Sequence, residues 1–270
     1  MITHDVLLPL SLAAVGALYL RGWWLLSLRM PARLDPRRLA AFAGGLAAVG
    51  LALVSPLETL ARSLLQAHMA QHLLLMVVAP PLLWLGAPVA PLLLGLPRRL
   101  RRRAALALAA RPIRRLTGWL AQPALAWAAF VTAFWLWHIP ALYDLALRSD
   151  GWHHVEHASF FVAGLLFWRP VILPWPSRPV WPRWAMLPYL LLAELQNASL
   201  AAILTFADRV LYRAYEALPT AGRLSALEDQ SLAGVIMWVP GSLPFLLPVI
   251  WLVLHLSTPQ QATLPLPSGE

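Results

Sequence analysis

The sequence contains no cysteine, and because lysine is also absent, all 21 of its basic residues are arginine. Without cysteine the chain cannot form disulfides, CxxC redox centres or thiolate metal sites. Any metal ion must therefore be held by histidine, methionine, carboxylate or backbone oxygen atoms.

Charge is scarce as well, since 12% of the residues are charged and 60% are hydrophobic. A soluble domain usually carries about 25% charged residues. Apolar runs longer than about 18 residues, the length of a spanning helix, recur along the chain. This pattern predicts an all-α integral membrane protein whose partner is the lipid bilayer. The arginines form no basic face with interleaved aromatic residues, so nucleic acid is not an expected partner.

Seven transmembrane helices are expected in a single membrane domain, residues 1–256. Pro80 and Pro81 should kink the third helix, and the apolar segment that follows, up to Leu96, is expected to lie at the membrane interface. The proline-containing residues 257–270 are expected to form a disordered tail. The predicted spans are 5–28, 38–56, 65–86, 120–139, 153–173, 184–207 and 231–256.

The first apolar stretch is predicted to be a span rather than a cleaved signal, because no basic residues precede it and Asp5 lies at its start.

The number of arginines on each side of the predicted spans gives the orientation. The segments after the first, third and fifth spans hold 15 arginines, and the opposite segments hold five. Because arginine-rich segments stay in the cytoplasm, we predict an outside N-terminus and a cytoplasmic C-terminus in the bacterial inner membrane.

This topology predicts that most of the histidines lie near the outer surface of the membrane. His68 and His72 open the third span, and His138 ends the fourth. Three more histidines, His153, His154 and His157, open the fifth span. Ionisable residues within spans are costly to bury, and they usually indicate a functional site.

The spacing of the histidines favours a metal site. His68 and His72 are four residues apart, as are His153 and His157, so each pair lies on one helical face about 6 Å apart along the axis. Neutral imidazole is the commonest protein ligand for copper, zinc, iron and nickel. We therefore expect these four histidines to bind a metal, with His138 and His154 as further candidates.

Other residues in the outer half are expected to support the site. Met69 adjoins the first histidine pair and offers a thioether, a ligand that favours Cu(I). Gln71 and Glu156 can orient imidazoles through their second ring nitrogen. The remaining supporting candidates, deeper in the spans or at their ends, are Asn197, Asp229 and Met237.

Alternative functions use similar histidines. In a metalloprotease HExxH motif the catalytic glutamate would stand at Met69, so zinc proteolysis is excluded. A membrane di-iron oxygenase or desaturase would also use HxxxH boxes, although those boxes face the cytoplasm. A transmembrane b-type haem protein would need two facing histidines, for example His72 and His157. Iron and haem thus remain alternatives to copper, but we expect a binding protein rather than an enzyme.

Four sequence motifs support a family assignment. They occur in one order along residues 55–256 and read HMAQHLLLM…APP…GAP, WHIPALYD, WHHVEHASF…GLLFW and EDQSLAG…MWVPG. Together they resemble the CtaG-like assembly factors of caa3-type cytochrome c oxidases. The resemblance implies a multi-spanning membrane protein that assists maturation of the oxidase copper centre, with the oxidase subunits as partners. It implies no mapped ligand set, so the residues proposed above depend on depth and spacing.

Overall fold

The computed structural model describes residues 2–28, 30, 35–175, 177–216 and 224–257, and these residues contain helices and no strand. The all-α prediction is confirmed; the predicted tail 257–270 lies outside the described residues except for Ser257. The elements are α1 (Ile2–Ser27), α2 (Pro36–Leu53), α3 (Pro56–Ala61), α4 (Leu65–Leu73), η2 (Leu74–Val78), α5 (Ala79–Leu85), α6 (Val89–Gly95), α7 (Arg98–Ala109), α8 (Arg111–Leu120), α9 (Pro123–Trp137), α10 (Pro140–Arg148), α11 (Asp150–Ile172), η3 (Arg183–Ala185), α12 (Met186–Phe206), α13 (Arg213–Glu216) and α14 (Ala226–Ser257).

Several of these helices are long and apolar enough to cross a membrane. Five qualify among the described residues, and a sixth span is available if α8 and α9, which meet at 66°, are counted together. The five overlap the predicted spans 5–28, 65–86, 153–173, 184–207 and 231–256. Helix α2 has 18 residues but begins with Pro36, Arg37 and Arg38, and it is not among them. The count of seven spans and the orientation therefore stay predictions.

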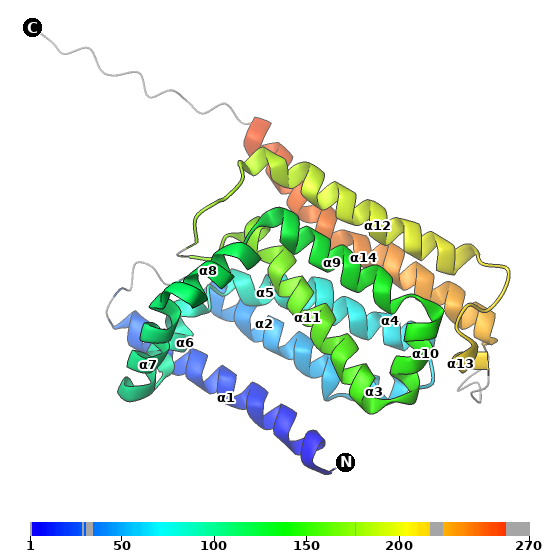
Figure 1. The fold of residues 1–270 in the computed structure, drawn as a ribbon, viewed down its shortest axis with the longest axis horizontal. Helices are drawn as coiled ribbons and strands as arrows, with labels where there is room; N and C mark the ends of the chain where they lie inside the picture. The colour runs from blue at the N-terminus through cyan, green and yellow to red at the C-terminus, as the bar shows by residue number, and fades with distance from the viewer. Residues whose placement is uncertain (1, 29, 31–34, 176, 217–223, 258–270) are drawn as a thin grey trace, which may run out of the picture.

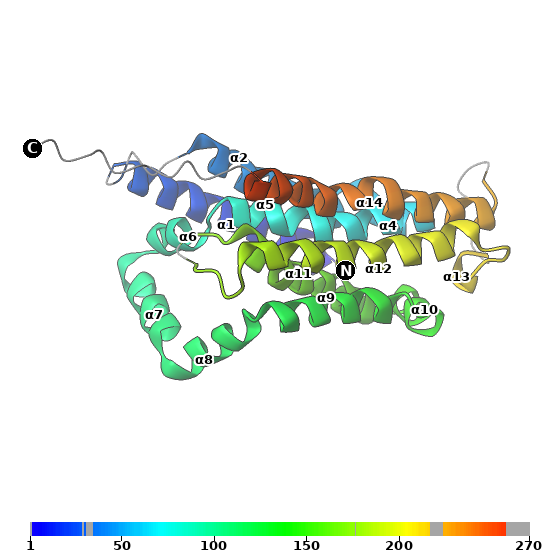
Figure 2. The ribbon, with the colours of Figure 1, turned by 90° about the horizontal axis from the view of Figure 1, so that it is seen from above.

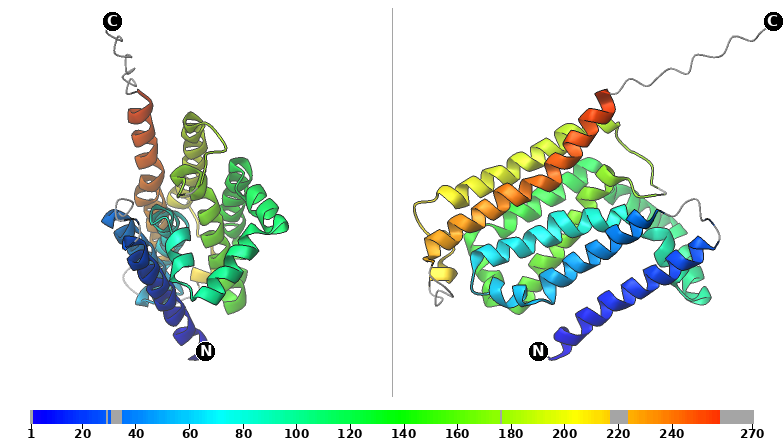
Figure 3. Two further views of the ribbon diagram at one scale, coloured as in Figure 1. Left: turned by 90° about the vertical axis from the view of Figure 1, so that its left-hand side faces the viewer. Right: turned by 180° about the vertical axis from the view of Figure 1, so that it is seen from behind.

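The helices form a bundle around the continuous segment α4–η2–α5. Helices α2, α11 and α14 pack against this segment, while α9 packs on α11 and α12 on α14. Helix α1 lies on the outside of the bundle and packs against α6 (Figure 3). Exposed apolar side chains, for example Val239 at 64% and Leu247 at 61%, cover the outer face of α14. Such a surface suits lipid rather than water.

The two ends of the bundle differ in chemistry. Helices α3, α10 and α13 lie at one end, next to the start of α4, whereas α6, α7 and α8 lie at the other (Figure 1). The predicted arginine-rich loop is helical: α7 and α8 form a bent arm between α6 and α9, and none of their residues is buried (Figure 2). Arginine, alanine and leucine are strong helix formers, which explains why this segment is not an irregular loop.

Pro80 and Pro81, predicted to kink the third spanning helix, lie at the start of α5 and directly follow a π-helical turn, η2. Pro80 has no N–H to donate to the carbonyl four residues earlier, that of Met76. The indole of Trp168 on α11 donates to this carbonyl instead, at 3.1 Å. Helix α11 can approach so closely because Gly164 faces the same carbonyl; a Cβ at Gly164 would lie 2.6 Å from it. The segment expected at the interface forms α6, which packs against α1.

Candidate metal centre

Five histidines from three helices converge at the α3–α10–α13 end of the bundle. His68 and His72 come from α4, and His153 and His157 from α11. His138 follows the last residue of α9. Each of the five is at most 7% exposed. The ring centroids of His68 and His153 lie 5.4 Å apart and those of His72 and His157 lie 5.7 Å apart, so the two pairs meet across the α4–α11 interface.

A group of four side chains has the geometry of a single-ion site. His68, His153, Glu156 and His157 each offer one ligand atom, and these atoms lie within 4.8 Å of one another. Glu156 was expected to orient an imidazole, but its carboxylate lies among the candidate ligand atoms. His72 is outside this group but remains next to it, because its Nε2 is 3.5 Å from Glu156 Oε1.

The polar atoms at the centre of this group have no hydrogen-bond partner. They include both carboxylate oxygens of Glu156, which is fully buried, and the Nε2 atoms of His68, His153 and His157. Buried polar atoms are almost always paired, because each unpaired one costs about 1–3 kcal/mol. Several such atoms around one point therefore indicate a missing positive partner.

The hydrogen bonds of His68 indicate which of its nitrogen atoms carries the proton. Its Nδ1 lies 3.4 Å from both the carbonyl oxygen of Ala61 and the hydroxyl of Tyr215. Tyr215 lies outside the spans, and burial raises the pKa of its hydroxyl above the ordinary value. The protonated hydroxyl donates to Ala61 O at 2.9 Å, so Tyr215 presents its lone pair to His68. Both neighbours of Nδ1 are then acceptors, which favours the proton on Nδ1 and leaves a lone pair on Nε2.

His68 Nε2 is 3.7 Å from Glu156 Oε2. This distance is too long for a hydrogen bond, and a lone pair facing a carboxylate is not an attractive arrangement. A cation between the two atoms would satisfy both, so the donor set fits a metal ion. The Ala61 carbonyl and the Tyr215 hydroxyl fix the tautomer of the His68 ring. Metal-binding histidines usually have such a hydrogen-bond partner at the ring nitrogen that does not bind the metal.

Charged residues surround the mouth of the site. Glu58, whose side chain is 28% exposed, lies with Oε1 3.9 Å from Nδ1 of His153 and accepts a hydrogen bond from the Gln71 amide. Gln71 also donates to the Ala52 carbonyl at 2.6 Å, so it holds Glu58 in place rather than orienting an imidazole. Arg62 contacts Glu58 at 3.4 Å and Asp150 at 2.9 Å. A carboxylate thus lies between solvent and the buried histidines, where it can attract cations.

Asp229, expected to support the metal site, contacts the backbone instead. Its carboxylate is buried and accepts hydrogen bonds from the N–H groups of Leu65 and Gln66, at 2.7 and 3.2 Å. These are the first residues of α4, whose own N-cap residue, Leu64, has no side chain that can accept a hydrogen bond. Asp229 on α14 is therefore the cap that fixes the start of the helix bearing His68 and His72.

Replacing Asp229 by alanine should destabilise the protein by about 1–3 kcal/mol, because two buried N–H groups would lose their acceptor. The measurement is the thermal unfolding midpoint of the purified protein in detergent. Asp208→Asn, at an exposed position, is the matched control and should leave the midpoint unchanged. Equal midpoints for Asp229→Ala and the wild type would contradict the capping role.

The remaining predicted residues lie in two different environments. Met69 and Met237 are buried and line a cavity of about 20 Å³ together with His72, His138 and Asn197. The amide of Asn197 donates to the Met237 carbonyl at 3.1 Å, so it links α12 to α14. His154, predicted as a further ligand, is exposed and lies outside the group of four.

Sequence reasoning did not identify Glu58, Tyr143, Tyr212 or Tyr215. The three tyrosines are buried beside the histidines; the hydroxyls of Tyr143 and Tyr215 lie 3.2 Å apart, and Tyr212 donates to the His138 carbonyl. A weak signal was present, since Tyr212 and Tyr215 are spaced by three residues in a segment between two predicted spans. The contacts of Tyr215 with Ala61 on α3 and His68 on α4 join residues that are 154 and 147 positions apart in the sequence, which no local pattern reveals.

Comparison with known proteins gives one clear family match. The model of the family described as Cytochrome c oxidase caa3 assembly factor (Caa3_CtaG) matches residues 17–258. Two curated relatives are 28% identical over 229 residues: Uncharacterized protein Mb0105 of Mycobacterium bovis and Uncharacterized protein MT0111 of Mycobacterium tuberculosis. The match covers 80% of this chain but 33% of each relative, so the chain spans about a third of their length. No solved structure matches the chain.

Proposed function

Since the chain belongs to the family of cytochrome c oxidase caa3 assembly factors, we propose that it binds a copper ion at the His68–His153–Glu156–His157 group and assists maturation of the oxidase copper centre. The observation that carries the proposal is the buried cluster of unpaired acceptor atoms. The proposed role is non-catalytic, and the proposed partners are the subunits of the oxidase. The proposed location is the bacterial plasma membrane.

The geometry favours a single ion over the alternatives considered from the sequence. The cavity beside His72 and His138 has a volume of about 20 Å³, which is enough for about one water molecule and far too small for a porphyrin. A di-iron site built from histidine boxes must supply ligands for two ions, whereas the group of four offers one ligand atom from each residue, all within 4.8 Å of one another, which suits one ion. Imidazole-rich sites suit copper, and the family assignment favours copper over zinc or nickel.

Deletion of the gene in the organism that encodes the chain tests this function. We expect a caa3-type oxidase with a reduced copper-to-haem ratio and reduced oxygen consumption, restored by the wild-type gene and by a His154→Ala variant but not by His157→Ala. Copper and haem content of the purified oxidase are the measurements. An oxidase with full copper content in the deletion strain would overturn the proposal.

The orientation is also part of the proposal, with the histidine end of the bundle outside and the arginine-rich helices α7 and α8 in the cytoplasm. Because the chain has no cysteine, single cysteines can be introduced without background labelling. Gly151 and Gly118 are exposed positions at the two ends, and a Cβ at either meets no heavy atom closer than 3.8 Å. In intact cells with a permeabilised outer envelope, a membrane-impermeant maleimide should label Gly151→Cys and not Gly118→Cys.

After cell lysis, the same reagent should label both variants, which controls for the intrinsic reactivity of each thiol. The wild-type chain should remain unlabelled throughout. Labelling of Gly118→Cys in intact cells would mean that the arginine-rich end faces outward, and the proposed orientation would then be wrong.

A further inference from the structure

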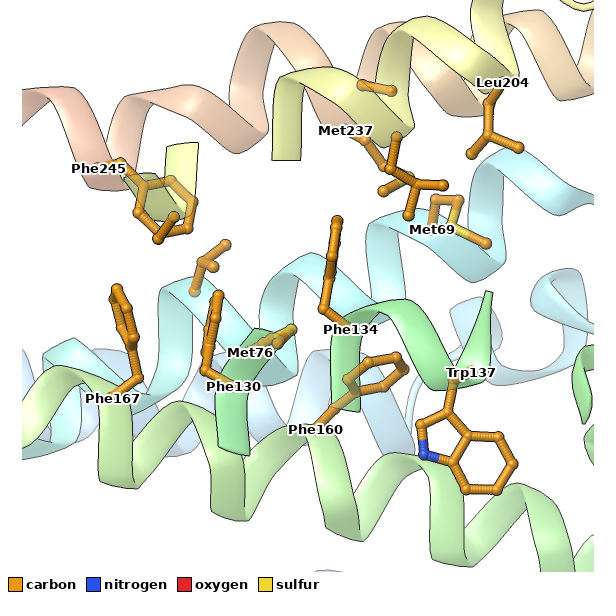
Figure 4. Packing of buried hydrophobic residues seen from close by; sticks show 14 of the residues in the cluster. Met69, Met76, Phe130, Phe134, Trp137, Phe160, Phe167, Leu204, Met237 and Phe245 are labelled. Carbon is orange, nitrogen blue, oxygen red and sulfur yellow. The ribbon is translucent and has the colours of Figure 1, made fainter. Parts of the chain in front are cut away.

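A second set of metal-ligating side chains lies directly beside the group of four. The cavity wall carries the thioethers of Met69, Met76 and Met237 and the imidazoles of His72 and His138. The three methionines belong to α4, η2 and α14, and each is at most 4% exposed. They belong to one cluster of buried side chains together with Phe130, Phe134 and Phe160 (Figure 4). This wall therefore combines soft sulfur ligands with imidazole in an apolar surrounding.

The two histidines show that the cavity is more than a hydrophobic packing defect. His138 is 7% exposed, and its Nδ1 lies 2.6 Å from the Phe134 carbonyl oxygen, which can only accept a hydrogen bond. The proton must therefore be on Nδ1, so Nε2 carries a lone pair, and this atom is buried without a partner. Both ring nitrogens of His72 are buried without a hydrogen-bond partner as well. Purely structural histidines at such depth are normally paired.

His72 belongs to both sites. Its Nε2 faces Glu156 of the first group at 3.5 Å, while the same ring lines the cavity and lies 6.2 Å from the ring of His138. Along α4, His72 is one turn further from the bundle end than His68, and Met76 lies about one turn beyond His72. The cavity thus continues the line of ligands from the first site towards the middle of the bilayer.

We propose that this cavity is a second binding site, for a soft monovalent ion such as Cu(I), formed by Met69, Met237, His72 and His138, with His72 passing the ion between the two sites. Thioether sulfur favours Cu(I), whereas the carboxylate and imidazoles of the first group also accept divalent ions. The inference rests on the proposed function, because it assigns the same ion a second position. Surplus ligands allow the ion to exchange one donor at a time as it moves.

Silver, Ag⁺, is a redox-silent probe for such a site. The full-length protein, purified in detergent, is loaded with Ag⁺ and desalted; bound silver is then counted, and sulfur neighbours are detected by X-ray absorption at the silver edge. We expect a sulfur signal from the wild type. The Met69→Leu/Met237→Leu double variant should lose most of this signal, with Met76 the one cavity thioether left, and should bind less silver per chain. Met186→Leu, at a buried methionine outside the cavity, should behave as the wild type.

A His153→Ala variant separates this inference from the proposed function. It should lose metal from the first group but keep the sulfur signal, because His153 does not line the cavity. If His153→Ala bound as much metal as the wild type, the proposed first site would be wrong, while a methionine-dependent sulfur signal would still support the second site. An absent sulfur signal in the wild type, or an undiminished one in the double variant, would overturn the inference.

Exchange of methionine for leucine preserves volume, so the double variant should fold, as a monodisperse elution profile would show. Met237→Leu alone provides the second measurement if the double variant aggregates. It should weaken the sulfur signal without abolishing it, and an unchanged signal in this variant would overturn the inference.

Discussion

His157→Ala should weaken metal binding by at least about 100-fold, whereas His154→Ala should leave it unchanged. Loss of a residue that hydrogen-bonds to a metal ligand lowers metal affinity by about 10–100-fold, and loss of a ligand itself lowers it by at least that much. Both residues are on α11, but His157 is 6% exposed and belongs to the group of four, while His154 is exposed. Competition with a chelator of known copper affinity, using protein in detergent, measures the difference.

The two variants form a matched pair, because each removes one imidazole from the same stretch of one helix. Non-specific copper binding to surface histidines would be reduced by His154→Ala and not by His157→Ala, because His154 is exposed and His157 is buried. His68→Ala should reproduce the His157→Ala result from the opposite helix, α4. Equal affinities for His157→Ala and His154→Ala would show that the buried group is not the binding site.

Glu156→Gln should stabilise the metal-free protein by about 1–3 kcal/mol and at the same time weaken metal binding. In the metal-free state the Glu156 carboxylate is fully buried, has no hydrogen-bond partner, and faces Nε2 of His68 and His72 at 3.7 and 3.5 Å. A glutamine of the same shape carries an NH2 group in place of one carboxylate oxygen, and this group can donate to the Nε2 lone pair of His68, which removes the repulsion between two acceptors. It also removes the anionic ligand, so stability and binding should change in opposite directions.

Glu194→Gln is the control for this prediction. Glu194 is likewise a carboxylate within a span, but it already accepts a hydrogen bond from the Ser242 hydroxyl at 2.5 Å, so its replacement should give no comparable stabilisation. Thermal unfolding with and without copper measures both effects for each variant. A Glu156→Gln protein that is less stable than the wild type without metal would contradict the account of Glu156 as an unsatisfied ligand.

Such a trade-off is expected of a protein that must bind an ion and then release it. If Glu156→Gln stabilises the metal-free protein and weakens metal binding, Glu156 serves binding rather than folding. Tyr215 fits this description, because it contacts Nδ1 of His68 and leaves Nε2 available. The Glu58 carboxylate, which is partly exposed and paired with Arg62, lies 3.9 Å from His153 and is the acidic group between the buried histidines and solvent.

Sequence periodicity predicts which residues share a helical face with Glu156, but not what that face contacts. His153, Glu156 and His157 are spaced i, i+3, i+4 and therefore share one face of a helix, whereas His154 points about 100° away from His153. The spacing therefore predicts which three residues of α11 belong to the group of four. It did not show that this face turns towards α4 rather than towards lipid, because that rotation is set by packing, including the close approach at Gly164.

The sequence alone determined the membrane environment and the all-α class of the fold, because apolar runs of spanning length with arginine between them suit only helices in a bilayer. It also determined the family and the common depth of the histidines, which follow from local motifs and from distance along the helices. Only the tertiary structure decided that Glu156 joins the group of candidate ligand atoms, that His154 lies outside it, and that Asp229 caps α4 although it is 164 positions from Leu65. These outcomes depend on how helices are rotated and paired, and such contacts between distant segments leave no periodic pattern in the chain.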